Sequence, residues 1–224
     1  LWRAFLRLPQ AMRSRLRARD LAAVSDTEAF RRPLGGYFRD RFEDLPPRPE
    51  KLRVLFVSPY PILPPVHGGG VFMHQTLSEL SRLCELHLIV LLHYAHELPA
   101  NEPLRAMCSS VEFLVKTNAR SQTAASILPH AVREFASEDL LWLIHRQLHT
   151  RRIDVLQLEY TPLAQYAGRF GRLVSALFEH DVYFQSVARG WSGLLGLTGK
   201  LAGAVEYLRA LRYETRALEH LDLV

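Results

Sequence analysis

Three short segments of the sequence carry residues that can hydrogen-bond or enclose a ligand. His180 and Asp181 stand in the string FEHD, and Glu159 and Tyr160 stand in the string LEY. Three consecutive glycines, Gly68–Gly70, follow the string PPVH. Glycine loses more backbone entropy on folding than any other residue, so three in a row need a reason. They can cradle a phosphate, form an oxyanion hole, or make a flexible turn.

From residue 51 onward, apolar stretches of strand length alternate with helical patterns. The stretches cover residues 52–60, 84–92, 111–116, 153–160 and 173–181. A helix is expected after the glycines, with an apolar stripe made of Val71, Leu77, Leu80 and Leu83. Two more helices are expected at 137–150, with Ser137 as cap, and at roughly 201–220. The string LDLV at 221–224 indicates a further strand. Continuous apolar strands separated by helices predict an α/β fold: a doubly wound, Rossmann-like parallel sheet with helices on both faces.

The three segments are expected to meet at one edge of this sheet. The glycines follow the first strand, LEY ends the fourth, and EHD ends the fifth. In open α/β sheets, ligands bind outside the carboxyl ends of the strands. Successive backbone N–H groups at a helix start can hold an anion there, and glycines let the backbone approach it closely.

Several better-known motifs fit this sequence poorly. No GxGxxG joins the first strand to its helix, and no acidic residue ends the second strand, which disfavours an NAD site. HGGG resembles an esterase oxyanion loop, but no GxSxG nucleophile accompanies it. GLLGLTGKL has the wrong spacing for a phosphate-binding P-loop and is expected to be a glycine-rich loop before a helix. His145 and His149 fit a solvated helix face better than a metal site.

Two of the candidate residues allow a local structural role as well. His180 either faces a ligand or is held by hydrogen bonds at its strand end. Glu159 is either a ligand-facing carboxylate or a capping partner for the turn that follows.

Composition separates the chain into two parts. Residues 1–50 are expected to be a basic, partly helical extension that ends in a proline-rich linker, and residues 51–224 the main domain. Arginines alternate with an apolar helical stripe near the start, as in a helix that packs on the domain or lies on an anionic membrane. With a net charge of +5 and two cysteines, we expect a cytoplasmic protein, peripheral at the inner face of the membrane, with no nucleic-acid partner.

Four strings in order resemble the N-terminal domain of family 4 glycosyltransferases, which are retaining enzymes of the GT-B fold. They are SPYPILPPVHGGGVFMHQTLSELSR, IDVLQLEYTPLAQYA, ALFEHDVYFQS and LRYETRALEHLDLV. The resemblance covers residues 51–224.

The resemblance implies a role for each candidate. Gly68, Gly69 and Gly70 would lie against the diphosphate of a nucleotide-sugar donor, and His180 would reach the donor sugar as the catalytic residue, with Asp181 in the same cleft. Glu159, Tyr160 and His74 would face a glycan or lipid-linked acceptor. The family needs no metal and no cofactor besides the nucleotide-sugar co-substrate.

The resemblance also implies a second domain that holds most nucleotide contacts, since family members pair two such domains. We therefore expect a fragment that is inactive alone, from an enzyme of cell-envelope polysaccharide synthesis. The alternative is a non-catalytic Rossmann-like module that binds a nucleotide or a glycan.

Overall fold

The computed structural model describes residue 12 and residues 51–116, 126–169, 173–193, 196–219 and 221–224. The chain divides into two units, Leu1–Pro47 and Arg48–Val224. Only Met12, in a helical conformation, is described in the first unit. The basic amphipathic helix and the linker predicted for residues 1–50 otherwise lie outside the described residues.

The second unit is built on a five-stranded, all-parallel sheet with the order β3-β2-β1-β4-β5. The strands are β1 (Arg53–Ser58), β2 (Glu85–Leu92), β3 (Ser110–Val115), β4 (Val155–Glu159) and β5 (Val174–Phe178). Each lies inside or next to a predicted apolar stretch. Leu223 adds an isolated parallel bridge to Ala176, where the sequence predicted a further strand.

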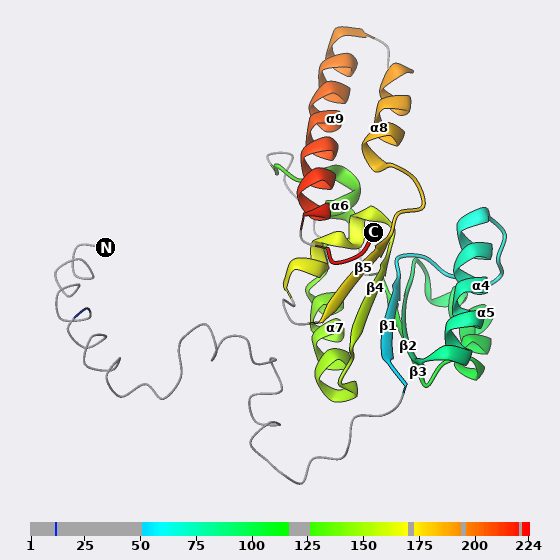
Figure 1. Ribbon diagram of the computed structural model, residues 1–224. Coiled ribbons are helices and arrows are strands. Elements are labelled where there is room, and N and C mark those ends of the chain that lie inside the picture. The colour runs from blue at the N-terminus through cyan, green and yellow to red at the C-terminus, as the bar shows by residue number, and fades with distance from the viewer. Residues whose placement is uncertain (1–11, 13–50, 117–125, 170–172, 194–195, 220) are drawn as a thin grey trace. The chain divides into compact units, whose positions relative to one another are not determined.

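Helices cover both faces of this sheet (Figure 1). The described helices of this unit are α4 (Gly68–Leu83), η1 (Ala95–Glu97), α5 (Leu98–Asn101), η2 (Glu102–Ala106), α6 (His130–Glu134), α7 (Glu138–Arg151), η3 (Thr161–Arg169), α8 (Tyr183–Ser192) and α9 (Gly196–Leu218). Val54 and Phe56 pack under α4, whereas Leu55 and Val57 pack under α7, because successive strand side chains point to opposite faces. The predicted doubly wound, Rossmann-like α/β fold is confirmed.

Two helices differ from the sequence prediction at their starts. The glycines were expected in a loop, but α4 begins at Gly68, and its buried residues are Gly70, Met73 and Leu77. Val71 and Leu83, assigned to the apolar stripe, are 39% and 73% exposed. Helix α9 begins at Gly196, inside the predicted glycine-rich loop, because it packs along α8 through Trp191 and Tyr207, whose ring centroids are 5.9 Å apart.

Helix α7 was predicted correctly, including its cap. Ser137 precedes it in an extended conformation, and its hydroxyl oxygen accepts a hydrogen bond of 3.2 Å from the backbone N–H of Leu140. The helix packs on the sheet through Leu140 and Ile144, both fully buried.

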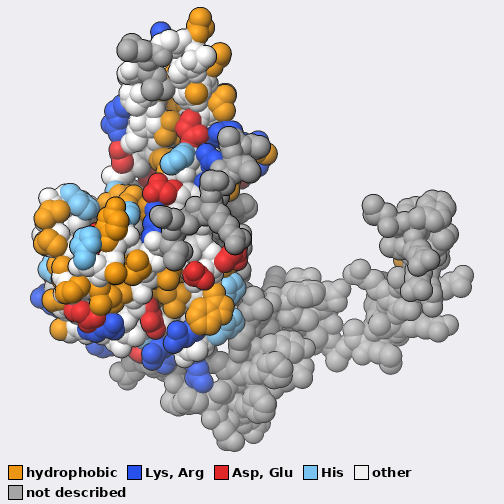
Figure 2. Space-filling model, turned by 180° about the vertical axis from the view of Figure 1, so that it is seen from behind, with side chains coloured by type: hydrophobic (Ala, Val, Ile, Leu, Met, Phe, Trp, Pro, Cys, Tyr) orange, Lys and Arg blue, Asp and Glu red, His pale blue; other side chains and the backbone are white. Residues whose placement is uncertain are grey.

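Helices α8 and α9 extend beyond the sheet as an antiparallel pair (Figure 1). Hydrophobic side chains line one side of this projection (Figure 2). The exposed apolar residues of α9 are Leu197, Leu201, Val205 and Leu208. None of the helices in the described part of the chain is long and apolar enough to cross a membrane.

Candidate functional site

Four of the residues singled out in the sequence form a contiguous group beyond the carboxyl ends of β4 and β5. We call Gly69, Glu159, Tyr160 and His180 the edge cluster. Tyr160 links its members, because its hydroxyl lies against Gly69 and its ring stacks on His180 at a centroid distance of 4.0 Å. The expected convergence of the glycines, LEY and EHD therefore holds for these four residues.

Gly69 leaves room for Tyr160. A Cβ atom at Gly69 would lie 2.0 Å from the Tyr160 hydroxyl oxygen, far inside contact distance, whereas a Cβ atom at Gly68 would meet nothing within 4 Å. Tyr160 itself adopts φ of 66°, a left-handed conformation that costs a non-glycine residue roughly 1–2 kcal/mol. The backbone N–H of Tyr160 still donates to the Phe178 carbonyl at 3.0 Å, so the turn remains tied to β5.

Glu159 and His180 form a buried pair. The Nε2 atom of His180 lies 2.7 Å from Oε2 of Glu159, whose side chain is fully buried, while the His180 side chain is 10% exposed. The other carboxylate oxygen accepts a hydrogen bond of 3.1 Å from Gln157. Glu159 therefore orients the imidazole ring, and it presents no exposed oxygen to a ligand.

This pairing defines what the imidazole can offer. In a neutral ring whose Nε2–H donates to Glu159, Nδ1 is left as a hydrogen-bond acceptor. His180 can therefore accept a hydrogen bond from a ligand hydroxyl.

The start of α4 supplies the hydrogen-bond donors next to this pair. His67 caps the helix, since its Nδ1 atom accepts a hydrogen bond of 3.0 Å from the N–H of Gly70. The amides of Gly68 and Gly69 have no hydrogen-bond acceptor among the described residues. Free N–H groups at a helix N-terminus carry partial positive charge and attract anions.

Two predicted site residues do not join the edge cluster. Asp181 is exposed and is bonded to the hydroxyl of Ser186 and to Arg189, at 2.6 Å, in α8. The hydrogen bond from Ser186, followed by the charge of Arg189, lowers the pKa of Asp181. His74 lies partly exposed in α4 and makes no hydrogen bond or ring contact with any described residue.

Aromatic residues that sequence reasoning missed surround the cluster. Phe72 stacks on Phe178 at 4.1 Å and meets His180 edge-on at 5.4 Å. Tyr60 contacts Tyr160 edge-on at 5.1 Å, and burial raises the pKa of Tyr60 to about 12. Two of these residues could have been found from their positions in the sequence. Tyr60 follows β1 and Phe178 ends β5, so both stand at the edge of the sheet where ligands bind.

A second buried carboxylate joins α9 to the start of α8. Glu214 of α9 is 1% exposed and accepts hydrogen bonds from the backbone N–H groups of Tyr183 (3.1 Å) and Phe184 (2.7 Å). Burial is the main cause that raises the pKa of Glu214 to about 7, and the neighbouring Glu179 adds to it. Glu179 also accepts a hydrogen bond of 2.8 Å from the hydroxyl of Thr161.

The raised pKa of Glu214 predicts a stability that falls as the pH rises. The folded state keeps a proton between pH 4.5 and about 7 that the unfolded state loses, so the folded state binds more protons there. We expect the free energy of unfolding to drop by on the order of 2 kcal/mol across this interval. Urea unfolding at several pH values measures it. Glu214→Gln should flatten the dependence, and an unchanged slope in that variant would contradict the assignment.

Within the part of the chain that the structure describes, no group of three or more His, Cys, Asp or Glu residues is arranged to hold a metal ion. His145 and His149 lie one helical turn apart in α7, with their rings 6.3 Å apart. The edge cluster offers backbone amides as hydrogen-bond donors and one imidazole nitrogen as an acceptor, which suit an anion with hydroxyl groups better than a cation.

Fold and site together define an α/β protein with a Rossmann-like parallel sheet and a polar, aromatic-lined cluster at its carboxyl edge. No protein-family model matches the sequence, and comparison with curated proteins gives no match. Among solved structures, the chain is similar to the C-terminally truncated TubZ of Clostridium botulinum phage c-st, with a TM-score of 0.38 and 7% identity. The similarity covers 76% of this chain and 51% of that chain, so this chain spans about half of the TubZ length. This similarity is too weak to indicate a function for this chain.

Proposed function

We propose that this chain is the N-terminal, acceptor-side half of a retaining glycosyltransferase that uses a nucleotide-sugar donor and a glycan or lipid-linked acceptor. One observation carries the proposal. Tyr160 contacts both Gly69 and His180, so a helix start with two free amides and an oriented imidazole share one edge of the sheet. A sugar joined to a diphosphate matches these two kinds of group.

In the proposed transfer, each element of the site has a part. The diphosphate accepts hydrogen bonds from the amides of Gly68 and Gly69, which stabilise the negative charge that grows as the leaving group departs. His180 accepts a hydrogen bond from a donor-sugar hydroxyl, and Glu159 fixes the orientation of the ring. The bond from the anomeric carbon to phosphate breaks while the bond to the acceptor oxygen forms on the same face. The acceptor proton passes to the leaving phosphate.

Glu159 has a different part from the one that the sequence predicted. Because its carboxylate is fully buried and bonded to His180, Glu159 is a positioning residue that fixes the imidazole, and the acceptor side is left to Tyr160 and His74. A second domain supplies the remaining nucleotide contacts, so this chain binds the diphosphate portion weakly and does not turn over alone.

The proposal predicts that a side chain at Gly68 removes diphosphate binding without harming the fold. A Cβ atom there meets no protein atom within 4 Å, but it would occupy the space that a phosphate needs beside the free amides. Calorimetric titration with uridine and guanosine diphosphates should show binding to the unmodified chain and at least a roughly tenfold loss in Gly68→Val.

The control for this titration is Gly190→Val in α8, where a Cβ atom also meets nothing within 4 Å. Equal affinity in the Gly68→Val, Gly190→Val and unmodified proteins would contradict the assignment of the diphosphate to α4. Diphosphate binding without transfer, in a protein that includes the second domain, would favour the non-catalytic nucleotide-binding module instead.

A further inference from the structure

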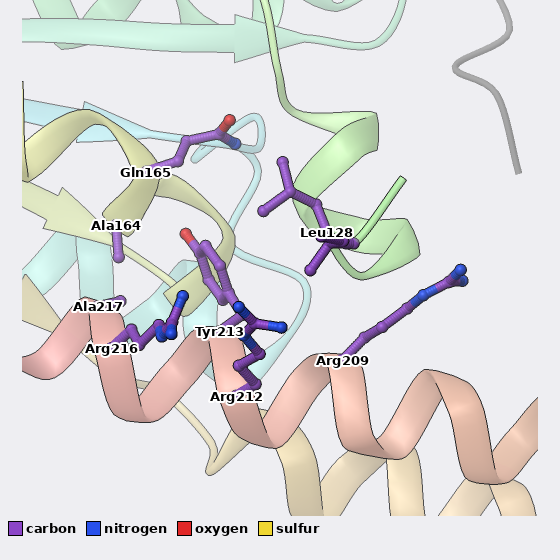
Figure 3. A pocket seen from close by; sticks show the side chains of 9 residues that line it. Leu128, Ala164, Gln165, Arg209, Arg212, Tyr213, Arg216 and Ala217 are labelled. Atoms are coloured by element: carbon purple, nitrogen blue, oxygen red, sulfur yellow. The ribbon is translucent and has the colours of Figure 1, made fainter. Parts of the chain in front are cut away.

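A cavity lies away from the edge cluster, between α9, η3 and the segment that leads into α6. It has a volume of about 220 Å³. Its walls include Ala164, Ala217 and the ring of Tyr213, and the exposed side chains of Ile127 (64%) and Leu128 (39%) border it. Figure 3 shows Leu128 and Gln165 facing the side chains that rise from α9. No residue of the edge cluster lines this cavity.

Three arginines give the cavity a positive border. Arg209, Arg212 and Arg216 recur at helical spacing, so they share one side of α9. Arg209 is paired with Glu206 at 3.4 Å. Arg212 and Arg216 are exposed and form no ion pair with any residue that the structure describes. Glu214, on the same stretch of helix, is buried against the start of α8, where its carboxylate accepts backbone hydrogen bonds.

The neutral hydrogen-bond donors of the cavity are already used. The Tyr213 hydroxyl donates to the carbonyl of Thr161 at 3.2 Å. The Gln165 side-chain nitrogen donates to the carbonyls of Val132 and Pro162 at 2.8 and 2.9 Å. The donors that remain for a ligand are therefore guanidinium groups next to apolar surface. This combination suits an anion that carries an apolar part, and it suits a sugar poorly.

The volume limits the apolar part of the ligand. Pockets for drug-sized ligands run from roughly 300 to 1,000 Å³, so a cavity of about 220 Å³ is smaller. A short alkyl segment fits inside, with its charged head at the arginines.

We propose that this cavity binds a single-chain amphiphilic phosphate, with the alkyl segment against Ala164, Ala217 and Leu128 and the phosphate on Arg212 and Arg216. A guanidinium fork makes two parallel hydrogen bonds to phosphate oxygens, which fixes the head group. Any soluble alkyl phosphate or single-chain lipid phosphate carries this chemistry. The inference does not depend on the proposed glycosyl transfer, because it uses none of the residues of the edge cluster.

Calorimetry on the full chain with octyl phosphate tests the site. We expect saturable binding of octyl phosphate, at least about tenfold weaker binding of inorganic phosphate, and no binding of octyl glucoside. A lipid phosphate is distinguished by its longer alkyl chain. If that alkyl chain continues along Ile127 and Leu128, dodecyl phosphate should bind more tightly than octyl phosphate. Equal affinities for the two chain lengths would point to a soluble, short-chain phosphate as the source.

Charge variants separate this site from unspecific attraction to a basic helix. Arg212→Gln and Arg216→Gln should each weaken octyl phosphate binding about tenfold, because each removes charged hydrogen bonds. Lys200→Gln removes the same charge from α9 outside the cavity and should leave the affinity unchanged. All three side chains are exposed, so the melting temperatures should stay equal. Binding that survives in Arg212→Gln/Arg216→Gln, or equal binding of inorganic phosphate, would overturn the proposal.

Discussion

Gly69→Val lowers the free energy of unfolding by about 3 kcal/mol or more, at the upper end of what overpacking costs. The new Cβ atom would lie 2.0 Å from the Tyr160 hydroxyl oxygen, so Tyr160 must leave its place on His180. Tyr160 has little freedom to adjust, since its backbone is held in a left-handed turn. Urea unfolding measures the loss.

The neighbouring glycine provides a matched control. Gly68→Val introduces the same side chain one residue earlier, where a Cβ atom meets nothing within 4 Å. Its free energy of unfolding should change by no more than about 0.5 kcal/mol. In a Tyr160→Ala background, Gly69→Val should also become nearly neutral, because the atoms that it strikes are gone. Equal losses at both glycines, or an undiminished loss in the Tyr160→Ala background, would disprove the close contact.

His180→Ala lowers the free energy of unfolding by about 3–5 kcal/mol, the cost of breaking a buried pair from one side. The substitution leaves the Glu159 carboxylate fully buried with a single remaining donor, the Gln157 amide. It also removes the ring that packs between Tyr160 and Phe178. Chemical unfolding near neutral pH measures the effect.

The contribution of the buried carboxylate can be isolated by a second substitution. In a Glu159→Gln background, His180→Ala should cost at least about 1 kcal/mol less, because no charge is left unpaired. His74→Ala is the control for losing a histidine without a partner and should stay within about 0.5 kcal/mol of the unmodified protein. An identical cost of His180→Ala in both backgrounds would show that the ring acts through packing alone.

The strands were predictable because β1 and β2 are nearly unbroken, buried apolar runs and the other three are mostly apolar, as expected of a parallel sheet covered on both faces. Helix α7 was equally clear, with a serine cap, an acidic first turn and a regular apolar stripe. These features depend on residues close together in the sequence, so local patterns were sufficient.

The start of α4 was not predictable in the same way. Three glycines indicate a loop because glycine is a poor helix former. The helix begins there nevertheless, since the ring of His67 caps it and Gly69 lets Tyr160 approach. The second reason lies about ninety residues further along the chain, and no local pattern reveals it. The apolar stripe of α4 was predicted in part: Leu77 faces the core as predicted, but Met73 does so too, whereas Val71 and Leu83 are exposed.

The edge cluster was predicted in part. The topology of a parallel sheet brings the ends of β4 and β5 together, which is why Glu159, Tyr160 and His180 were found from their positions. The pairing of Glu159 with His180 depends on side-chain burial, and the left-handed turn at Tyr160 depends on contacts with β5. The positions of these residues were therefore predicted, but Glu159 was assigned to the acceptor. In the structure its carboxylate is buried and paired with the imidazole of His180.

The most direct test of the central claim is a titration of the ¹⁵N-labelled chain with uridine and guanosine diphosphate sugars, followed by the amide resonances. If the diphosphate binds at the start of α4, the largest shifts will be those of Gly68 and Gly69, accompanied by the ring signals of His180. Gly68→Val should abolish these shifts and leave the rest of the spectrum unchanged. Shifts confined to other parts of the chain, or none at concentrations where Gly68 and Gly69 should be occupied, would contradict the proposed function.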